Sequence, residues 1–379
     1  MKLLHSHIIS GIAGSEGYLL NILPELKRRG NNVEFLCLYK KGEIEQTQKF
    51  CSILEKHDIP SFKVEIPKIP LLGTFRKINA IIKKGSYDIV HSHLLHADLL
   101  ISTTKYLFRQ KFKLVSTKHG YEEWYNNQYG FDPSHKVKNR YWRLARFAEK
   151  MTTRSYAISN GLYNLYSGLG ICPKEKFDLI YYGFDFDDSY SHNEEFRFGS
   201  PQLAIVGRLT GFKGHRYAFG AIKILKEKYP DIRLVVIGSG ELEQELMQLT
   251  IELGISENVV FTGFQPNPRD YVFTSDLALL PSISEGFGLV VLEAMSVKKA
   301  LITFDVPSPN ELLVHKETGW LVEPYNVSEY AKAIDHLMED KSLRETIASN
   351  AYSRLKDYYN LTRMVDETEA FYAKVIAHT

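Results

Sequence analysis

The chain repeats one pattern in two series: a short apolar run, a turn that contains glycine, and a segment with helical periodicity. The first series opens with KLLHSHIIS, GIAGSEG and YLLNILPELKRRG, and the second opens with PQLAIVGRLTGFKG. Strands that alternate with helices in this way indicate a parallel sheet with helices on both faces. Because 379 residues exceed what one ordinary domain holds, we expect an α/β chain with two doubly wound, Rossmann-like domains.

We place the domain boundary in GFDFDDSYSHNEEFRFGSPQ, a stretch without clear periodicity. Residues 1–185 form the predicted N-terminal domain, and residues 200–361 form the predicted C-terminal domain. A last helix, from about residue 362 to the end, can pack back on the first domain. Ligands of such sheets bind beyond the carboxyl ends of the strands. Two such edges that face each other would enclose a cleft, so we expect functional residues in the turns that follow strands.

Composition excludes several classes of protein. Hydrophobic residues make up 44% and charged residues 24%, as in globular rather than disordered or fibrous chains. No apolar stretch approaches the roughly 18 residues that a membrane span needs. The three cysteines cannot form a closed disulfide framework and show no C-x-x-C spacing. These features predict a cytoplasmic protein.

A basic turn follows the first strand of the second series. It contains Gly207-Arg208-Leu209 and then Lys213-Gly214, so both cations would project from the edge of the sheet. A planar guanidinium and a compact ammonium together suit a diphosphate. Two solvated surface cations are the equally weighted alternative. The next strand ends in Gly238-Ser239-Gly240, which lacks the full dinucleotide spacing and is a weak phosphate signal by itself.

The segment SISEGFGLVVLEAMS, Ser282 to Ser296, contains two glutamates eight positions apart. Gly286 and Gly288 would let backbone N–H groups approach a ligand, and a helix is expected to begin at Leu289. An ionised carboxylate accepts hydrogen bonds from vicinal sugar hydroxyls, so Glu285 and Glu293 are candidates to hold two sugars. Alternatively, Glu285 caps the start of the helix, where an acidic side chain interacts favourably with the helix dipole, and Glu293 is a surface residue. The apolar neighbours of Glu293 argue against the second interpretation.

These motifs resemble those of the family four retaining glycosyltransferases, which have the GT-B fold. The likeness rests on Gly-Arg-Leu with Lys213-Gly214, and on Glu285-Gly-Phe-Gly-Leu-x-x-x-Glu293. Weaker matches are Ala13-Gly14-Ser15-Glu16, Val90-His91-Ser92-His93, Thr117-Lys118-His119-Gly120 and Tyr182-Gly183-Phe184-Asp185. Ala13 departs from the family's usual glycine, and Lys298-Lys299-Ala300 departs from its usual Gly-x-Pro.

The resemblance implies a role for each matching residue. Arg208 and Lys213 would bind the donor diphosphate, and Glu293 would bind the nucleotide ribose. Glu285 and His119 would act at the transferred sugar and are the predicted catalytic residues. The remaining predicted donor-binding residues are Gly14, Gly207, Gly238, Gly286, Phe287, Gly288 and Leu289.

The predicted function is retaining transfer of a hexose or N-acetylhexosamine. The donor would be a nucleotide diphosphate sugar, expected to be a UDP-sugar, and the acceptor a hydroxyl of a lipid-linked or surface glycan. Two alternatives stay open: a sugar-nucleotide epimerase or hydrolase on the same frame, and a non-catalytic nucleotide-sugar-binding protein. Product analysis with the donor alone would separate the first from a transferase.

Two candidate metal sites are weaker. Asp185-Phe-Asp187-Asp188 has the spacing of a divalent-cation motif, but the rest of such a ligand set is missing. His5, His7, His91, His93 and His96 come in strand-like pairs, yet no cysteine or carboxylate completes a tetrahedral zinc set. We therefore expect neither a metal ion nor another cofactor, because the two cations can neutralise the diphosphate.

A basic stretch near the middle of the chain suggests a second partner. Residues 105–154 contain 12 Lys+Arg and 4 Asp+Glu, and a helical projection gathers the cations with Phe147 on one face. Such a face suits anionic lipid head groups, and a solvated charged face is equally weighted. Nucleic acid is disfavoured because no binding motif accompanies the charge. The cations proposed for a peripheral membrane contact are Lys136, Arg140, Arg143, Arg146 and Lys150, and the helical projection also includes Arg154.

Overall fold

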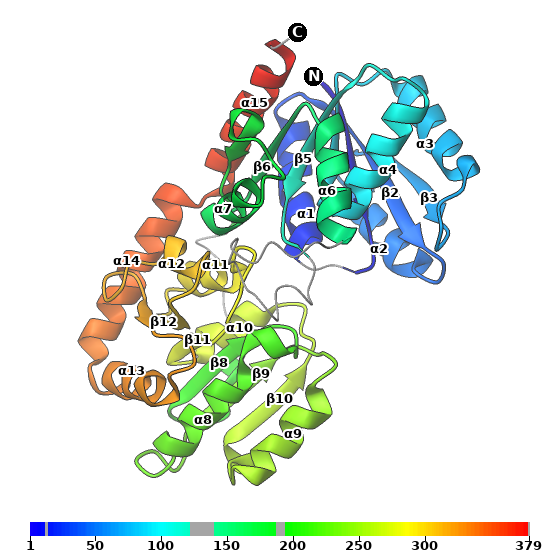
Figure 1. Cartoon of the computed structure of the whole chain (residues 1–379). Helices are drawn as coiled ribbons and strands as arrows, with labels where there is room; N and C mark the ends of the chain where they lie inside the picture. The colour runs from blue at the N-terminus through cyan, green and yellow to red at the C-terminus, as the bar shows by residue number, and fades with distance from the viewer. Residues whose placement is uncertain (12–13, 122–139, 187–193, 378–379) are drawn as a thin grey trace. The chain divides into compact units, whose positions relative to one another are not determined.

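The computed structural model describes residues 1–11, 14–121, 140–186 and 194–377, and divides the chain into two compact units (Figure 1). The first unit contains the described residues up to Asp185 together with the segment from Leu361 onward. The second unit runs from Phe186 to Asn360. Each unit has its own parallel sheet, which confirms the predicted pair of doubly wound α/β domains.

Seven parallel strands form the sheet of the first unit, in the order β3-β2-β1-β4-β5-β6-β7. The order reverses between β1 and β4, and in sheets of this type such a point marks the ligand side. The strands are β1 Lys2–Ile8, β2 Asn32–Lys40, β3 Ser61–Ile66, β4 Ile89–His93, β5 Lys113–Lys118, β6 Arg154–Ala157 and β7 Phe177–Leu179. The helices are α1 Gly14–Arg28, α2 Ile44–Glu55, α3 Leu72–Gly85, α4 Leu94–Leu107, α6 Arg140–Met151, α7 Asn160–Gly168 and α15 Leu361–Ala377.

Six parallel strands form the sheet of the second unit, in the order β10-β9-β8-β11-β12-β13. Here the order reverses between β8 and β11. The strands are β8 Gln202–Val206, β9 Arg233–Ile237, β10 Val259–Gly263, β11 Leu277–Leu280, β12 Leu301–Phe304 and β13 Trp320–Val322. The helices are α8 His215–Leu225, α9 Glu243–Glu252, α10 Pro268–Thr274, α11 Leu289–Ser296, α12 Pro309–Leu312, α13 Val327–Glu339 and α14 Lys341–Tyr358.

The last helix, α15, packs within the first unit although it follows the second in sequence. Glu369 accepts hydrogen bonds from Arg29 at 3.1 Å and from the Asn31 amide at 2.7 Å. The Tyr372 hydroxyl lies 2.7 Å from Nδ1 of His91 on β4. Side chains of α15 therefore reach the interior of the first sheet layer.

A buried ion cluster ties two helices to the centre of the first sheet. Lys118, at the end of β5, lies 2.9 Å from Asp98 of α4 and 3.3 Å from Glu149 of α6, and all three residues are buried. Ser116 and Ser155 donate further hydrogen bonds to the two carboxylates. Burial disfavours the ammonium ion, but the charges of Asp98 and Glu149 outweigh burial and raise the pKa of Lys118 above its ordinary value. Lys118 is therefore a cation in the folded protein.

Lys118→Met should destabilise the first unit by about 3–5 kcal/mol, because it leaves two buried carboxylates without their cation. Chemical denaturation followed by circular dichroism measures this loss. Lys228→Met is the matched control, since Lys228 also bridges two carboxylates, Asp335 and Glu339, but at an exposed site. Its effect should be small. Equal losses in the two variants would show that the Lys118 cluster does not stabilise the fold as described.

Candidate functional site

Two loops at the carboxyl ends of β8 and β11 contact each other through their backbones. The Ile283 N–H donates to the Phe212 carbonyl at 2.8 Å. Gly214, with φ +70°, lies so close to Pro281 that a Cβ atom there would sit 1.9 Å from the Pro281 carbonyl oxygen. Only glycine fits both this φ and this approach. The contact holds the loop of Arg208 and Lys213 against the loop of Glu285, at the reversal point of the sheet.

Lys213 and Glu285 form an ion pair across these two loops. The Lys213 Nζ lies 2.7 Å from Glu285 Oε1, and both side chains are largely shielded from solvent. The guanidinium of Arg208 and the ammonium of Lys213 lie 5.8 and 5.5 Å from the centre of the Phe212 ring. The structure thus brings three of the predicted residues together: Glu285 pairs with Lys213, and Lys213 and Arg208 lie over the same Phe212 ring.

Glu293 lies on α11, which begins at Leu289 as expected. Its Oε2 atom is shielded from solvent and has no hydrogen-bond partner among the described residues. Burial raises the pKa of this carboxyl group, and the charges of Arg269 and Lys213 oppose the rise. The ionised form of a buried carboxyl group that lacks a hydrogen-bond partner is stabilised by any group that donates a hydrogen bond to it.

The glycines of the predicted set shape the backbone around this group. Gly288, with φ +89°, is the N-cap of α11, and Phe287 beside it is buried. The Gly286 carbonyl accepts a hydrogen bond from the Ser308 hydroxyl at 3.1 Å. A Cβ on Gly238 would lie 2.0 Å from the Gly207 carbonyl oxygen, so a side chain there would force the turns after β8 and β9 apart.

Three further polar residues near these loops were not predicted from the sequence. The Thr210 hydroxyl, the Ser282 hydroxyl and both ring nitrogens of His215 are buried without hydrogen-bond partners in the described part of the chain. Burial, aided by the charge of Lys213, lowers the pKa of His215 to about 4, so its ring is neutral. Buried polar atoms without partners are uncommon in folded proteins and point to a polar ligand or water nearby. Nothing in the sequence around these residues signals this.

The predicted residues of the first unit are His119, which follows β5, and Gly14, which begins α1. Next to Gly14, the Ser15 hydroxyl lies 3.1 Å from Nε2 of His7. Glu16 lies 3.4 Å from the same nitrogen. Burial acts to raise the pKa of Glu16, but the hydrogen bond and charge of His7 outweigh it and lower the pKa.

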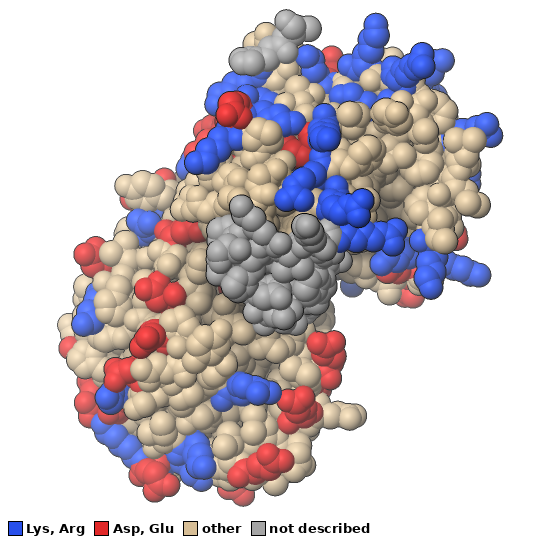
Figure 2. All heavy atoms as spheres, viewed as in Figure 1, with Lys and Arg blue, Asp and Glu red and all other residues tan. Residues whose placement is uncertain are grey.

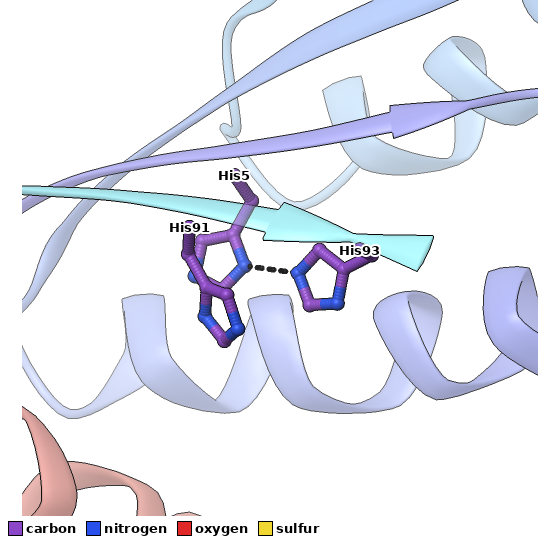
Figure 3. A group of neighbouring side chains, drawn as sticks. All are labelled: His5, His91 and His93. Atoms are coloured by element: carbon purple, nitrogen blue, oxygen red, sulfur yellow. Dashed lines mark hydrogen bonds between the residues drawn. The ribbon is translucent and has the colours of Figure 1, made fainter. Parts of the chain in front are cut away.

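Three buried histidines of β1 and β4 lie side by side on one face of the first sheet (Figure 3). His5, His91 and His93 offer ring nitrogens within 4.8 Å of one another, a spacing that one metal ion could bridge. However, His5 Nδ1 lies 3.0 Å from His93 Nε2, and His93 Nδ1 lies 3.0 Å from His119 Nε2. A metal ion would have to break these hydrogen bonds, and no carboxylate belongs to the group of described residues. Of the other candidate metal motif, Asp187 and Asp188 lie outside the described residues.

The predicted basic face is present in part. Arg140, Arg143, Arg146 and Lys150 are exposed on α6, and Phe147 is exposed among them. Figure 2 shows Lys and Arg gathered over the region of the first unit where Figure 1 draws α6. Lys136 lies outside the described residues. The inclusion of Arg154 in this helical face was wrong, because Arg154 lies on β6, where Asp178 accepts its hydrogen bonds at 2.6 and 3.0 Å.

Comparison with known proteins agrees with this arrangement. Residues 12–188 match the family Glycosyltransferase Family 4, and residues 188–354 match the family Glycosyl transferases group 1. The chain is 23% identical to UDP-Gal:alpha-D-GlcNAc-diphosphoundecaprenol alpha-1,3-galactosyltransferase of Escherichia coli, over 100% of this chain and 98% of that enzyme.

Solved structures share the fold. The Anabaena protein HepE in complex with UDP and glucose superposes with a TM-score of 0.83 at 21% identity, over 99% of this chain and 100% of that one. A glycosyltransferase from Rickettsia africae superposes with a TM-score of 0.80 at 20% identity, over 100% and 99% of the two chains. Since the two family matches together span residues 12–354, the chain belongs to the glycosyltransferases of the family four type, with the GT-B fold.

Proposed function

We propose that the protein transfers a hexose or N-acetylhexosamine from a UDP-sugar to a hydroxyl of a lipid-linked or surface glycan, with retention at the anomeric carbon. The choice of UDP is supported by HepE, solved with UDP and glucose, and by the Escherichia coli enzyme, whose name specifies UDP-Gal and a diphosphoundecaprenol acceptor.

One observation carries the proposal: the Lys213 ammonium and the Glu285 carboxylate are 2.7 Å apart at the reversal point of the second sheet. In a nucleotide sugar, the bond that breaks joins the diphosphate to the transferred sugar. A cation suits the phosphate side of that bond, and a carboxylate suits the hydroxyls on the sugar side. Adjacent groups of these two kinds therefore match the reacting end of the donor.

The rest of the site extends along the same donor. Arg208 would share the diphosphate charge with Lys213, and backbone N–H groups at the start of α11 would add donors. Glu293 would accept hydrogen bonds from the ribose hydroxyls, which supply the donors that Oε2 lacks among the described residues. His119 would contact the transferred sugar from the first unit. Because cations of the chain neutralise the diphosphate, the proposal includes no metal ion and no other cofactor.

In the reaction, the bond from the anomeric carbon to the phosphate oxygen breaks as the acceptor oxygen bonds to the same face. The acceptor hydroxyl gives its proton to the departing phosphate oxygen. Arg208 and Lys213 would stabilise the negative charge that develops on the leaving diphosphate, and such preorganised charges are an effective form of catalysis. Glu285 would hold the sugar in place while positive charge develops on its ring.

Contact with anionic lipids would bring the enzyme to a lipid-linked acceptor. None of the described helices is both long and apolar enough to cross a bilayer. The exposed cations of α6 provide a peripheral contact instead, and Phe147 among them supplies an apolar side chain for the lipid interface.

Glu285→Ala should lower kcat by about 100- to 1,000-fold while nucleotide binding is largely kept, since its contacts are assigned to the sugar. Lys213→Ala should weaken binding of UDP by about 10- to 100-fold, the usual cost of a charge-assisted hydrogen bond. Radiolabel transfer with and without acceptor measures the first effect, and calorimetry measures the second. Lys332→Ala removes an exposed lysine that is also paired with a glutamate, and should change neither. The roles are wrongly assigned if the two site variants show the reverse pattern.

The affinity for the donor should increase as the pH is raised past the pKa that Glu293 has in the unliganded protein. Burial raises that pKa, and ribose hydroxyls that donate to the carboxylate would lower it in the complex. The ionised form is then the binding form, so protonation at acidic pH weakens binding. Calorimetric titration with a nucleotide sugar tests this, because its diphosphate does not titrate in the same range. Glu293→Gln should bind weakly and without this pH dependence; a wild-type affinity that stays level or improves in acid would rule the role out.

Binding to anionic vesicles should be salt-sensitive and should fall when Arg140, Arg143 and Lys150 are changed to Glu, because the exposed cations attract the head groups. Arg146 is left intact because it donates a hydrogen bond to the Leu169 carbonyl. Vesicle sedimentation measures the effect. The control is the same charge reversal on α3 at Arg76, Lys77 and Lys84, which are also exposed. Equal loss in both triple variants would show that α6 is not the contact.

A further inference from the structure

His119 is the end of a continuous chain of hydrogen bonds inside the first unit. From His119, the chain runs through His93 on β4 to His5 on β1, with nitrogen–nitrogen distances of 3.0 Å at both steps. His5 Nε2 then lies 3.3 Å from the Tyr372 hydroxyl of α15. The same hydroxyl lies 2.7 Å from His91 Nδ1, and His91 Nε2 lies 2.7 Å from the Thr117 hydroxyl. Parallel pairing sets His5 of β1 opposite His91 of β4, and His93 of β4 opposite Thr117 of β5, so these side chains share one face of the sheet. The hydrogen-bonded rings of His119, His93 and His5 are called the histidine row below.

The rings in this chain are neutral at physiological pH. Burial lowers the pKa of His5 to about 3. Burial, together with nearby positive charges, also lowers the pKa of His91, His93 and His119 well below its ordinary value. A neutral imidazole has one N–H group and one lone pair, and each nitrogen–nitrogen hydrogen bond contains one proton. The tautomers of His5, His93 and His119 are therefore coupled: all three must donate in the same direction along the chain.

The distance between Tyr372 and His5 indicates that direction. A hydroxyl donor makes shorter hydrogen bonds than an imidazole N–H donor, about 2.7 Å against about 2.9 Å or more. His91 makes two 2.7 Å contacts and, as a neutral ring, donates in one of them, so these two distances do not set the direction. The 3.3 Å contact exceeds the range typical of a hydroxyl donor and is therefore assigned to His5 Nε2–H. The Tyr372 O–H then donates to His91 Nδ1, and His91 Nε2–H donates to the Thr117 hydroxyl.

His5 Nδ1 then carries a lone pair that accepts from His93 Nε2–H. Because neutral His93 has its only N–H group at Nε2, its Nδ1 carries a lone pair and accepts from His119 Nε2–H.

We propose that Tyr372, His5 and His93 are positioning residues that hold His119 in its Nε2–H tautomer, with the Nδ1 lone pair available to accept a hydrogen bond from a hydroxyl of the transferred sugar. This inference rests on the proposed function, since it takes the sugar as the partner of His119. Among the described residues, no hydrogen bond is formed at His119 Nδ1, and the ring is half-buried. A neutral ring fixed as an acceptor selects a hydroxyl at that position and does not act as a general acid.

The chain also accounts for four histidines and a tyrosine in an interior that could hold apolar side chains. Replacement of any one member would leave a buried N–H group or lone pair without a partner. A single metal ion at His5, His91 and His93 would need lone pairs from all three rings at one point. The coupled tautomers instead direct these lone pairs along the row, one to each neighbour.

Nitrogen-15 NMR of histidine-labelled full-length protein tests the proposal. In the wild type, His119 should show a protonated Nε2 and an unprotonated Nδ1, with its signals assigned by their loss in His119→Gln. Tyr372→Phe removes the acceptor of His5 Nε2–H. The direction of donation along His5, His93 and His119 should then reverse, because a buried lone pair without a partner is tolerated better than a buried N–H group. His119 should become the Nδ1–H tautomer, and donor binding should weaken by about two- to ten-fold, as expected for one lost hydrogen bond.

Tyr330→Phe is the matched control, because it also removes a buried hydroxyl with a 2.8 Å hydrogen bond, to Ile302, but in the second unit. It should leave the His119 tautomer and donor binding unchanged. A protonated Nδ1 at His119 in the wild type, or an unchanged His119 tautomer in Tyr372→Phe, would overturn the proposal that Tyr372, His5 and His93 position His119. Unchanged donor binding in His119→Gln would instead overturn the sugar contact assigned to His119, whatever the tautomer.

Discussion

The backbone contact between the loops after β8 and β11 determines the geometry of the candidate site. Gly214 approaches the Pro281 carbonyl more closely than any side chain permits, and the Ile283 N–H donates to the Phe212 carbonyl. This contact brings Lys213 and Glu285, 72 positions apart in the sequence, into an ion pair. The assigned roles in diphosphate binding, sugar binding and leaving-group stabilisation all depend on this one juxtaposition.

Much of this site could be predicted from local sequence, because each part of it lies in a single strand-turn-helix unit. The alternation of strands and helices predicted both sheets, and the glycines of SISEGFGLVVLEAMS predicted a turn and a helix that begins at Leu289. The ion pair of Lys213 with Glu285 could not be predicted, since it depends on which strands are neighbours. The same holds for Thr210, Ser282 and His215, whose burial without partners is a property of the packed fold.

The histidine row illustrates the same limit within the first unit. Spacing alone predicted pairs of histidines on one face of a strand, and the missing cysteine or carboxylate argued against a zinc site. The hydrogen-bonded row depends on the register of β1, β4 and β5 and on Tyr372, which reaches it from the end of the chain. Helical projection likewise placed Arg154 on the basic face, because it could not show that the helix ends at Met151 and a strand begins at Arg154.

The central claim is that Lys213 and Glu285 bind opposite sides of the bond that breaks in the donor. A crystal structure of the protein with an intact UDP-sugar tests it most directly. The account predicts that Lys213 Nζ hydrogen-bonds to a diphosphate oxygen and that the Glu285 carboxylate accepts hydrogen bonds from hydroxyls of the transferred sugar. A complex in which Lys213 and Glu285 contact only each other, with the phosphate–sugar bond bound elsewhere, would contradict it.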